Sequence, residues 1–261
     1  MKKTIVFTPF ILSVIFFTSC SNPVDVNTLE QKENKMYRKN LLYSGKSIEK
    51  YPEGNVKTKM RYKDGLLTGS YCSYFKNGEK ESDGMYKMGE RTGIWNRYYE
   101  TGKKYLEGGF IDGKKDGEWI YWYEDGQMEY KGLWREDVQE GLWLSWYKDC
   151  KPHSEIEWHN GLQHGKEIKF YPNGVKRSEG NFQNGKQVGP WKWYFESGKV
   201  ESEENWKDGQ PQGMVTNYYE SGQKKKETHW ENGVKQGLIK EWDENGNLVS
   251  EKQADSAFSR K

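Results

Sequence analysis

The side chains best suited to chemistry lie in one stretch, where Cys150 is followed by His153, His159 and His164. Thiolates and imidazoles are ligands that zinc prefers, so this cluster raises the question of a metal site. His153 falls near a predicted turn, however, and His159 lies about 20 Å further along an extended strand. Zinc needs its ligands within about 2.3 Å of one point. We therefore expect no metal site and no cofactor, only surface variation within one degenerate repeat.

Glutamates recur along the chain at positions that could be taken for catalytic carboxylates. They include Glu107, Glu155, Glu179, Glu203 and Glu227. Glycoside hydrolysis requires one special pair of carboxyl groups, whereas these acids form a regular ladder beside regular aromatic residues. Such a ladder is typical of cross-strand support. Because the sequence also shows no phosphate-binding loop, nucleophile elbow or catalytic triad, we expect no catalytic residues and no enzymatic activity.

The first cysteine, Cys20, ends a segment that stands apart from the rest of the chain. A basic start and the apolar run over residues 5–17, too short to span a membrane, indicate a secretory signal. The letters FTSC that end at Cys20 resemble a bacterial lipobox. That resemblance implies cleavage after residue 19 and a lipid on Cys20 that anchors the protein to a membrane. Ser21 would favour the outer membrane of a Gram-negative cell envelope, and an ordinary signal peptide with a chance cysteine is the alternative.

The charge balance and composition narrow the possible partners and the possible core. The chain has 41 Lys and Arg against 39 Asp and Glu, and removal of residues 1–19 would remove two lysines and no acids. The remaining formal charge is about zero, so the charge pattern required for nucleic-acid binding is missing. Aromatics make up 15% of residues while the mean hydropathy is −1.10. We expect aromatic rings, rather than aliphatic side chains, to supply the buried surface.

Glycine recurs every 24 residues from Gly45 to Gly237, without insertion or deletion. A second series in the same phase marks predicted turns, and Cys150 fills its one gap. A third series runs from Gly65 to Gly233. Three series in one phase indicate a repeat protein. The predicted turn glycines are Gly54, Gly78, Gly102, Gly126, Gly174, Gly198, Gly222 and Gly246.

Each unit is predicted to be one β-hairpin. Asn-Gly or Asp-Gly between aromatic-rich runs favours a two-residue type I′ turn, and looser segments such as residues 87–93 would link successive hairpins. The resulting register pairs Phe75 with Lys80, Ser73 with Ser82, Tyr71 with Gly84, Trp95 with Gly108, and Trp119 with Gly132. A glycine opposite each tryptophan would leave room for the ring to lie across the neighbouring strand.

Alternation along the strands predicts two different sheet faces. The aromatic-rich face is the candidate interaction face, and the other carries one aromatic per unit beside an acid. The candidate interaction residues are Tyr71, Trp95, Trp119, Trp143, Trp191, Tyr99 and Tyr123. An exposed stripe of this size exceeds the usual apolar patch of a monomer, so we expect sheet curvature or a partner to cover it. Full burial of Trp95, Trp119 and Trp191 within one chain would argue against a binding role.

The unit resembles the MORN repeat, in the bacterial variant found in chains labelled YwqK-like antitoxins. The resemblance rests on the core from Tyr98 to Glu107 and on the G-x-x-x-G-x-W linker from Gly113 to Trp119. It covers residues 43–251 and implies an all-β fold: one elongated, twisted, antiparallel sheet of successive hairpins. About eight hairpins, with strands ~4.8 Å apart, would make a sheet about 75–80 Å long.

The chain is thus divided into a signal peptide (1–19), a lipid-anchored polar tether (20–42), the repeat domain (43–251) and a C-terminal tail (252–261). Cys72 and Cys150 lie about three hairpins apart, too far for a disulfide within one chain, although Cys150 could pair between chains. The repeat breaks over residues 135–141 and 150–153, and at Glu167, where tryptophan is expected. These breaks reflect either function or sequence drift.

Several functions are compatible with these features. The leading hypothesis is a lipid-anchored envelope scaffold that binds a protein partner or self-associates. The second is an antitoxin or immunity-like protein that neutralises a toxin. Binding of glycans or membrane lipids through the aromatic face is the third, although a net charge near zero weakens attraction to anionic lipids.

Overall fold

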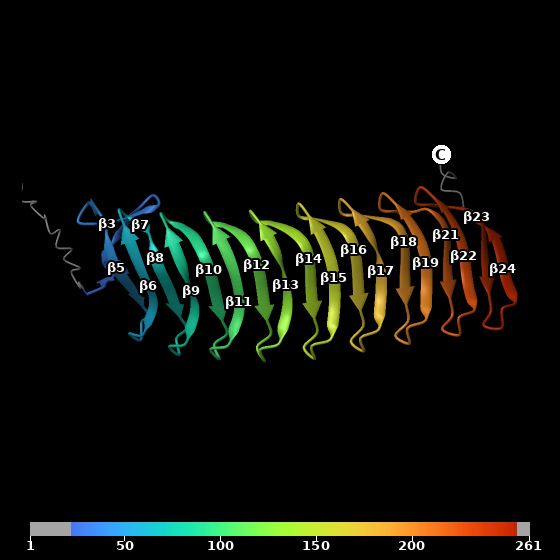
Figure 1. Cartoon of the computed structure of the whole chain (residues 1–261), viewed down its shortest axis with the longest axis horizontal. Coiled ribbons are helices and arrows are strands. Elements are labelled where there is room, and N and C mark those ends of the chain that lie inside the picture. Colours follow the sequence, from blue (N-terminus) through green and yellow to red (C-terminus); the bar gives the residue numbers. More distant parts are fainter. Residues whose placement is uncertain (1–21, 255–261) are drawn as a thin grey trace, which may run out of the picture.

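The computed structural model describes residues 22–254, so the predicted signal segment and lipid attachment at Cys20 lie outside the described residues. Successive antiparallel hairpins stand side by side in one long sheet, which confirms the predicted fold class (Figure 1). None of the described residues forms a helix long and apolar enough to cross a membrane.

The sheet has 21 strands. They are β1 (Val24–Asp25), β5 (Gly45–Lys50), β6 (Val56–Lys63), β7 (Leu66–Leu67), β8 (Gly69–Tyr74), β9 (Lys80–Lys87), β10 (Glu90–Tyr98), β11 (Lys104–Ile111), β12 (Lys114–Trp122), β13 (Met128–Arg135), β14 (Val138–Trp146), β15 (Pro152–His159), β16 (Leu162–Phe170), β17 (Lys176–Gln183), β18 (Lys186–Tyr194), β19 (Val200–Lys207), β20 (Gln210–Pro211), β21 (Gly213–Tyr218), β22 (Lys224–Glu231), β23 (Val234–Trp242) and β24 (Leu248–Gln253). Within the described residues, β5 to β24 make nine hairpins, one more than the approximate number expected, because the unit with Cys150 at its tip also folds as a hairpin.

The type I′ turns lie at the opposite ends of the strands from the predicted turns. Met88 and Gly89 both have positive φ (53° and 91°) and join Lys87 of β9 directly to Glu90 of β10. This is the geometry of a two-residue type I′ turn. The segments expected to be loose linkers are therefore tight hairpin turns, and each strand pairs with both of its sequence neighbours.

The predicted Asn-Gly tips instead form three-residue loops. The Gly78 N–H donates to the Phe75 carbonyl at 3.0 Å, and the Phe75 N–H donates to the Glu79 carbonyl at 2.8 Å. With Gly78 at a φ of 89°, this is a type I turn followed by a glycine bulge. The predicted pairing of Phe75 with Lys80 is wrong, because Lys80 pairs with Tyr74.

The bulge also explains why the rest of the predicted register is correct. The three-residue loop adds one residue to the turn, and the bulge takes it up before the next strand pair. The confirmed pairs are Ser73 with Ser82, Tyr71 with Gly84, Trp95 with Gly108, and Trp119 with Gly132.

The first edge of the sheet is covered by the segment that was expected to be only a polar tether. β1 pairs in parallel with β5, a 3-10 turn follows at Val26–Thr28, and β2 (Glu30–Lys32), β3 (Lys35–Arg38) and β4 (Leu41–Leu42) form a small second sheet. Leu29, Tyr43 and Tyr62 form a buried cluster beneath this region. Residues 22–42 therefore cap the repeat array.

The last strand extends beyond the expected end of the repeat domain. β24 continues to Gln253, and the Ala254 N–H donates to the Gly237 carbonyl at 2.8 Å. Lys252 and Gln253, assigned to the tail from sequence, are therefore part of the sheet, and Ala254 is hydrogen-bonded to it. Residues 255–261 lie outside the described range.

Candidate functional site

The aromatic-rich face contains most of the core. Trp95, Trp119 and Trp191 are only 5%, 4% and 2% exposed. Each indole N–H donates to a carbonyl of the preceding strand, and Trp119 reaches Gly109 at 3.1 Å. These rings serve packing, so the idea that they form an exposed binding stripe loses its support. Trp143, the fourth predicted tryptophan, stays half-buried.

The ring of each of these tryptophans lies over a glycine, on the strand before it. A Cβ on Gly84, Gly108, Gly132 or Gly180 would overlap the ring of the tryptophan eleven residues later. Where the preceding strand carries a residue larger than glycine, the later position holds a residue other than tryptophan: the pairs are Met60 with Tyr71, Ile156 with Glu167, Glu204 with Val215, and Thr228 with Ile239. The glycine opposite on the following strand is not required, because Trp191 pairs there with Glu204.

This rule also accounts for Glu167, where the tryptophan series breaks. Glu167 is 3% exposed, accepts a hydrogen bond from Gln163 at 3.1 Å and pairs with Lys169 at 3.0 Å. Its neighbour Ile156 leaves no bare backbone for an indole ring to cover. Packing therefore explains this break.

Tyr99 and Tyr123, also predicted for the interaction face, connect the hairpin tips. The Tyr99 hydroxyl donates to the Trp122 carbonyl at 2.7 Å, and the Tyr123 hydroxyl donates to the Trp146 carbonyl at 3.0 Å. Each bond spans 23 residues and reaches the next hairpin. We refer to this series as the tyrosine ladder. Its other members are Tyr51, Tyr147, Tyr171 and Tyr219.

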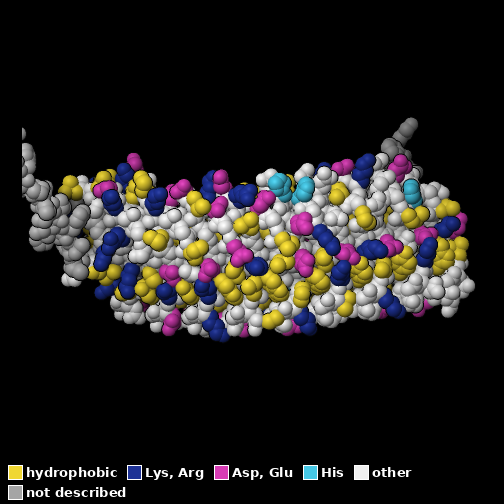
Figure 2. Space-filling model, viewed as in Figure 1, with side chains coloured by type: hydrophobic (Ala, Val, Ile, Leu, Met, Phe, Trp, Pro, Cys, Tyr) yellow, Lys and Arg dark blue, Asp and Glu magenta, His cyan; other side chains and the backbone are white. Residues whose placement is uncertain are grey.

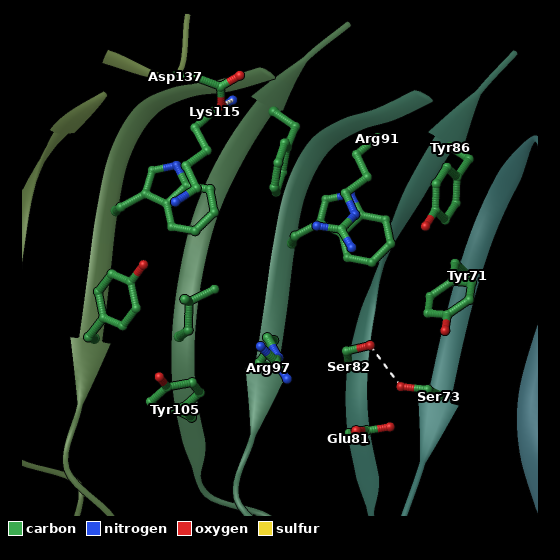
Figure 3. Close-up of a pocket in the computed structure, with 15 residues that line it drawn as sticks. Tyr71, Ser73, Glu81, Ser82, Tyr86, Arg91, Arg97, Tyr105, Lys115 and Asp137 are labelled. Atoms are coloured by element: carbon green, nitrogen blue, oxygen red, sulfur yellow. Dashed lines mark hydrogen bonds between the residues drawn. The ribbon is translucent and has the colours of Figure 1, made fainter. Parts of the chain in front are cut away.

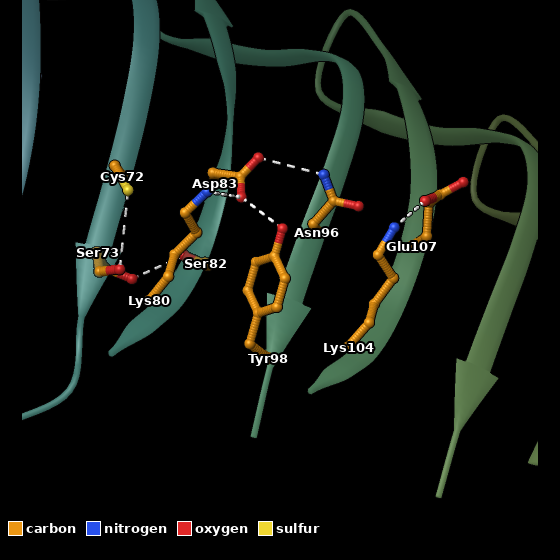
Figure 4. A network of polar contacts seen from close by, with 9 residues as sticks. All are labelled: Cys72, Ser73, Lys80, Ser82, Asp83, Asn96, Tyr98, Lys104 and Glu107. Atoms are coloured by element: carbon orange, nitrogen blue, oxygen red, sulfur yellow. Dashed lines mark hydrogen bonds and ion pairs between the residues drawn. The ribbon is translucent and has the colours of Figure 1, made fainter. Parts of the chain in front are cut away.

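The opposite face carries the predicted aromatic and acid pairs. A row of hydrophobic side chains runs along it, with acidic and basic groups interspersed (Figure 2). The Tyr98 hydroxyl donates to Asp83 at 2.8 Å, and Lys80 and Asn96 bind the same carboxylate (Figure 4). Burial and this hydrogen bond raise the pKa of Tyr98 to about 12. Tyr194 and Glu179 repeat the arrangement at 2.6 Å, which supports the interpretation of the acids as cross-strand contacts.

Two grooves hollow the aromatic-rich face. The first has a volume of about 490 Å³ and lies over β8 to β12, with Arg91, Arg97 and Lys115 among its lining residues (Figure 3). The second has a volume of about 550 Å³ and continues toward β15. Tyr121 lines both grooves, so they adjoin along one face.

A pair of small residues lies on the floor of each groove. In the first, the Ser73 and Ser82 hydroxyls are 2.8 Å apart; in the second, Ser145 and Ser154 are 2.7 Å apart. The two pairs are three repeats apart. Positions of the same series hold bulky side chains in between, such as Tyr121 stacked on Tyr130 at 4.1 Å. The grooves thus coincide with the two hairpins of the described residues in which both of these positions hold serine.

The cysteine and histidines are spread around the second groove and the adjacent turns. His153 lines the groove 3.2 Å from the Ser145 hydroxyl, and burial together with nearby cations lowers its pKa. His159 contacts Glu140 at 2.9 Å near the other edge of the sheet. No group of three or more potential metal ligands occurs within residues 22–254. In the same range, Cys72 in β8 and Cys150 in its turn are free thiols.

Comparison with known proteins identifies the repeat. A family model described as the MORN repeat variant matches residues 115–136, 163–184, 187–208, 211–232 and 235–254. No curated protein matches the chain significantly. Two solved structures show distant similarity. A Tc holotoxin pore from Photorhabdus luminescens is 11% identical over 84% of this chain and 14% of that chain, with a TM-score of 0.21. A crystal structure of TcdB2-TccC3-TEV is 12% identical over 87% of this chain and 15% of that one, with a TM-score of 0.17.

Proposed function

Since the matched units of this chain are MORN repeats in one continuous sheet, we propose that the protein is a non-enzymatic scaffold that binds a protein partner at a membrane. The observation that carries this proposal is that the residues that hold the sheet together are separate from the open grooves on its surface. Tryptophans and turn tyrosines hold neighbouring hairpins together, while two adjoining grooves remain open on one face. Repeat sheets of this kind offer long surfaces suited to extended partners.

Attachment to the membrane is assigned to a lipid on Cys20, on the strength of the FTSC motif and the signal-like segment before it. Cys20→Ala should move the protein from the membrane fraction to the soluble fraction of the cell envelope. The matched control is Cys150→Ala, which makes the same substitution at an exposed thiol and should leave the protein membrane-bound. Retention of the Cys20→Ala protein in the membrane would reject lipid anchoring.

Partner binding can be tested by placing a photo-crosslinking residue at His153, in the second groove, or at Lys166, on the opposite face. We expect a discrete crosslinked species in intact cells from His153 and none from Lys166. A partner that arrests growth when expressed alone, and is tolerated together with this protein, would make the scaffold an antitoxin. Absence of any adduct from either site would contradict the scaffold proposal.

A further inference from the structure

The first groove contains cations that the chain itself supplies. The Arg91 guanidinium lies 4.8 Å from the centre of the Trp95 ring and 5.3 Å from that of Phe110. One repeat later, the Lys115 ammonium lies 4.6 Å from Trp119 and 4.2 Å from Trp134. In both repeats a cation therefore sits between the tryptophan four residues later and the aromatic nineteen residues later. This is a favourable cation–π arrangement.

The next repeat keeps both aromatic rings and lacks the cation. Gln139 occupies the position of Arg91 and Lys115, and the corresponding rings are Trp143 and Trp158. All three line the second groove. Both tryptophans are half-buried, in contrast with Trp95 and Trp119, which are 5% and 4% exposed. Among residues 22–254, no lysine or arginine lies over either ring.

The surroundings of these rings favour a positive group. Glu129 is in the lining of the second groove, and that lining contains no lysine or arginine among the described residues; Lys169 and Arg177 lie near His153, outside the lining. The space itself exists because Ser145 and Ser154 follow the bulky Tyr121–Tyr130 stack. A carboxylate in a groove that also contains partly exposed aromatic rings complements a cation electrostatically.

We propose that the second groove binds a lysine or arginine side chain of the partner protein, held between Trp143 and Trp158 in the place that Arg91 and Lys115 occupy in the preceding repeats. This inference rests on the proposed scaffold function and names the chemistry of its partner. Two repeats of the chain thus show the geometry of the interaction with a cation from the chain itself, and in the third repeat the partner protein supplies the cation. One such contact corresponds to roughly 3- to 30-fold in affinity.

The test uses the indole N–H signals of the ¹⁵N-labelled protein. It is titrated with N-acetyl-arginine methylamide and, in parallel, with the uncharged citrulline analogue. We expect arginine to shift the signals of Trp143 and Trp158, assigned with Trp143→Phe and Trp158→Phe, and to bind at least about threefold more tightly than citrulline. The buried indoles of Trp95, Trp119 and Trp191 should not shift.

Gln139→Lys supplies the missing cation from within the chain and should abolish these shifts without unfolding the protein. The matched control is Gln187→Lys, which adds the same charge at the same repeat position, beside Trp191. That ring is only 2% exposed, so the control should bind the probe like the unchanged protein. Equal effects of the two lysines would show a general charge effect and overturn the proposal.

Two further outcomes would also overturn the proposal. Equal binding of the citrulline analogue would mean that the groove recognises hydrogen-bonding groups instead of charge. Tighter binding of tetramethylammonium than of the arginine probe would point to a lipid headgroup as the source of the cation. Because Gln139→Lys leaves Cys20 and the His153 crosslinking site intact, a persistent His153 adduct in this variant would reject the cation site while retaining the scaffold.

Discussion

At the residue scale, stability depends on bare backbone under large rings. At the repeat position of Trp119, the chain places tryptophan only where the strand before it offers glycine, and the indole then packs flat and donates a hydrogen bond to that same strand. An aromatic side chain buried this way removes about 150–250 Å² from water. The sequence shows the spacing of tryptophan and glycine. It does not show which neighbouring strand the indole ring covers, because Trp119 has a glycine opposite it on both strands.

Gly108→Ala should destabilise the protein by about 1–3 kcal/mol, because the added methyl group would overlap the Trp119 ring and push it off the strand. The free energy of unfolding in urea measures the effect. In a Trp119→Val background, which mimics the natural Val215 position, the same alanine should cost less than about 0.5 kcal/mol. Equal costs in both backgrounds would show that the ring and the glycine are not coupled.

The tyrosine–carboxylate pairs predict a loss of stability at alkaline pH. Burial and the bond to Asp83 raise the pKa of Tyr98 to about 12, and burial with Glu179 raises that of Tyr194 to about 12. Their contribution is complete below the ordinary tyrosine pKa of 10.0 and is lost as pH rises through about 12. Urea midpoints between pH 9 and 12 should fall less steeply for Tyr98→Phe/Tyr194→Phe. Parallel pH profiles for the two proteins would refute this linkage.

At the element scale, the hairpins follow from the sequence but their turns do not. The 24-residue glycine series and alternating aromatics define strands and register, since only one register puts Trp119 beside glycine on each side. The turn type depends on backbone angles that Asn-Gly and Met-Gly both permit, so Asn77-Gly78 misleadingly predicted a type I′ turn while Met88-Gly89 forms one. The grooves were also missed: the Ser73–Ser82 pair was predicted, but the space above it depends on how side chains of neighbouring hairpins pack.

Cys150→Gly should stabilise the protein by about 0.5–1 kcal/mol. Cys150 has a φ of 65° at the turn position where the other hairpins have glycine, and a side chain is costly in this left-handed region. The hydrogen bond from its thiol to Gln127 is exposed and offsets little of that cost. Thermal unfolding measures the gain. Gly126→Ala, one repeat earlier, should have the opposite sign; a loss in both variants would show that φ does not control this turn.

At the scale of the whole molecule, the array is close to one-dimensional. Each strand of the repeats pairs with its two neighbours in the sheet, and the end caps are the exception. Stability in such arrays is approximately the sum of the units and the interfaces between them. Folding should therefore tolerate the deletion of whole 24-residue repeats, but not a deletion that shifts the remaining repeats out of this period.

Deletion of residues 187–210 removes one complete period and should leave a folded protein whose Tm is only a few degrees lower. Residue 211 then follows residue 186 in the position that residue 187 held. Deletion of residues 187–198 removes the same turn but only half a period, which reverses the direction of every later strand. Circular dichroism and thermal unfolding distinguish them. Similar melting of both deletions would contradict the one-dimensional description.

The tyrosine ladder also gives the array a direction, and the ladder ends at Asp243. Tyr219 bonds forward to the Trp242 carbonyl of the last described hairpin, where the equivalent position is Asp243. Asp243 turns inward and accepts hydrogen bonds from the backbone N–H groups of Asn245 and Asn247, so it satisfies its own loop. A designer who wished to lengthen the protein would therefore insert hairpins upstream of Asp243, where a residue without the tyrosine hydroxyl is tolerated, as Phe75 and Phe195 show.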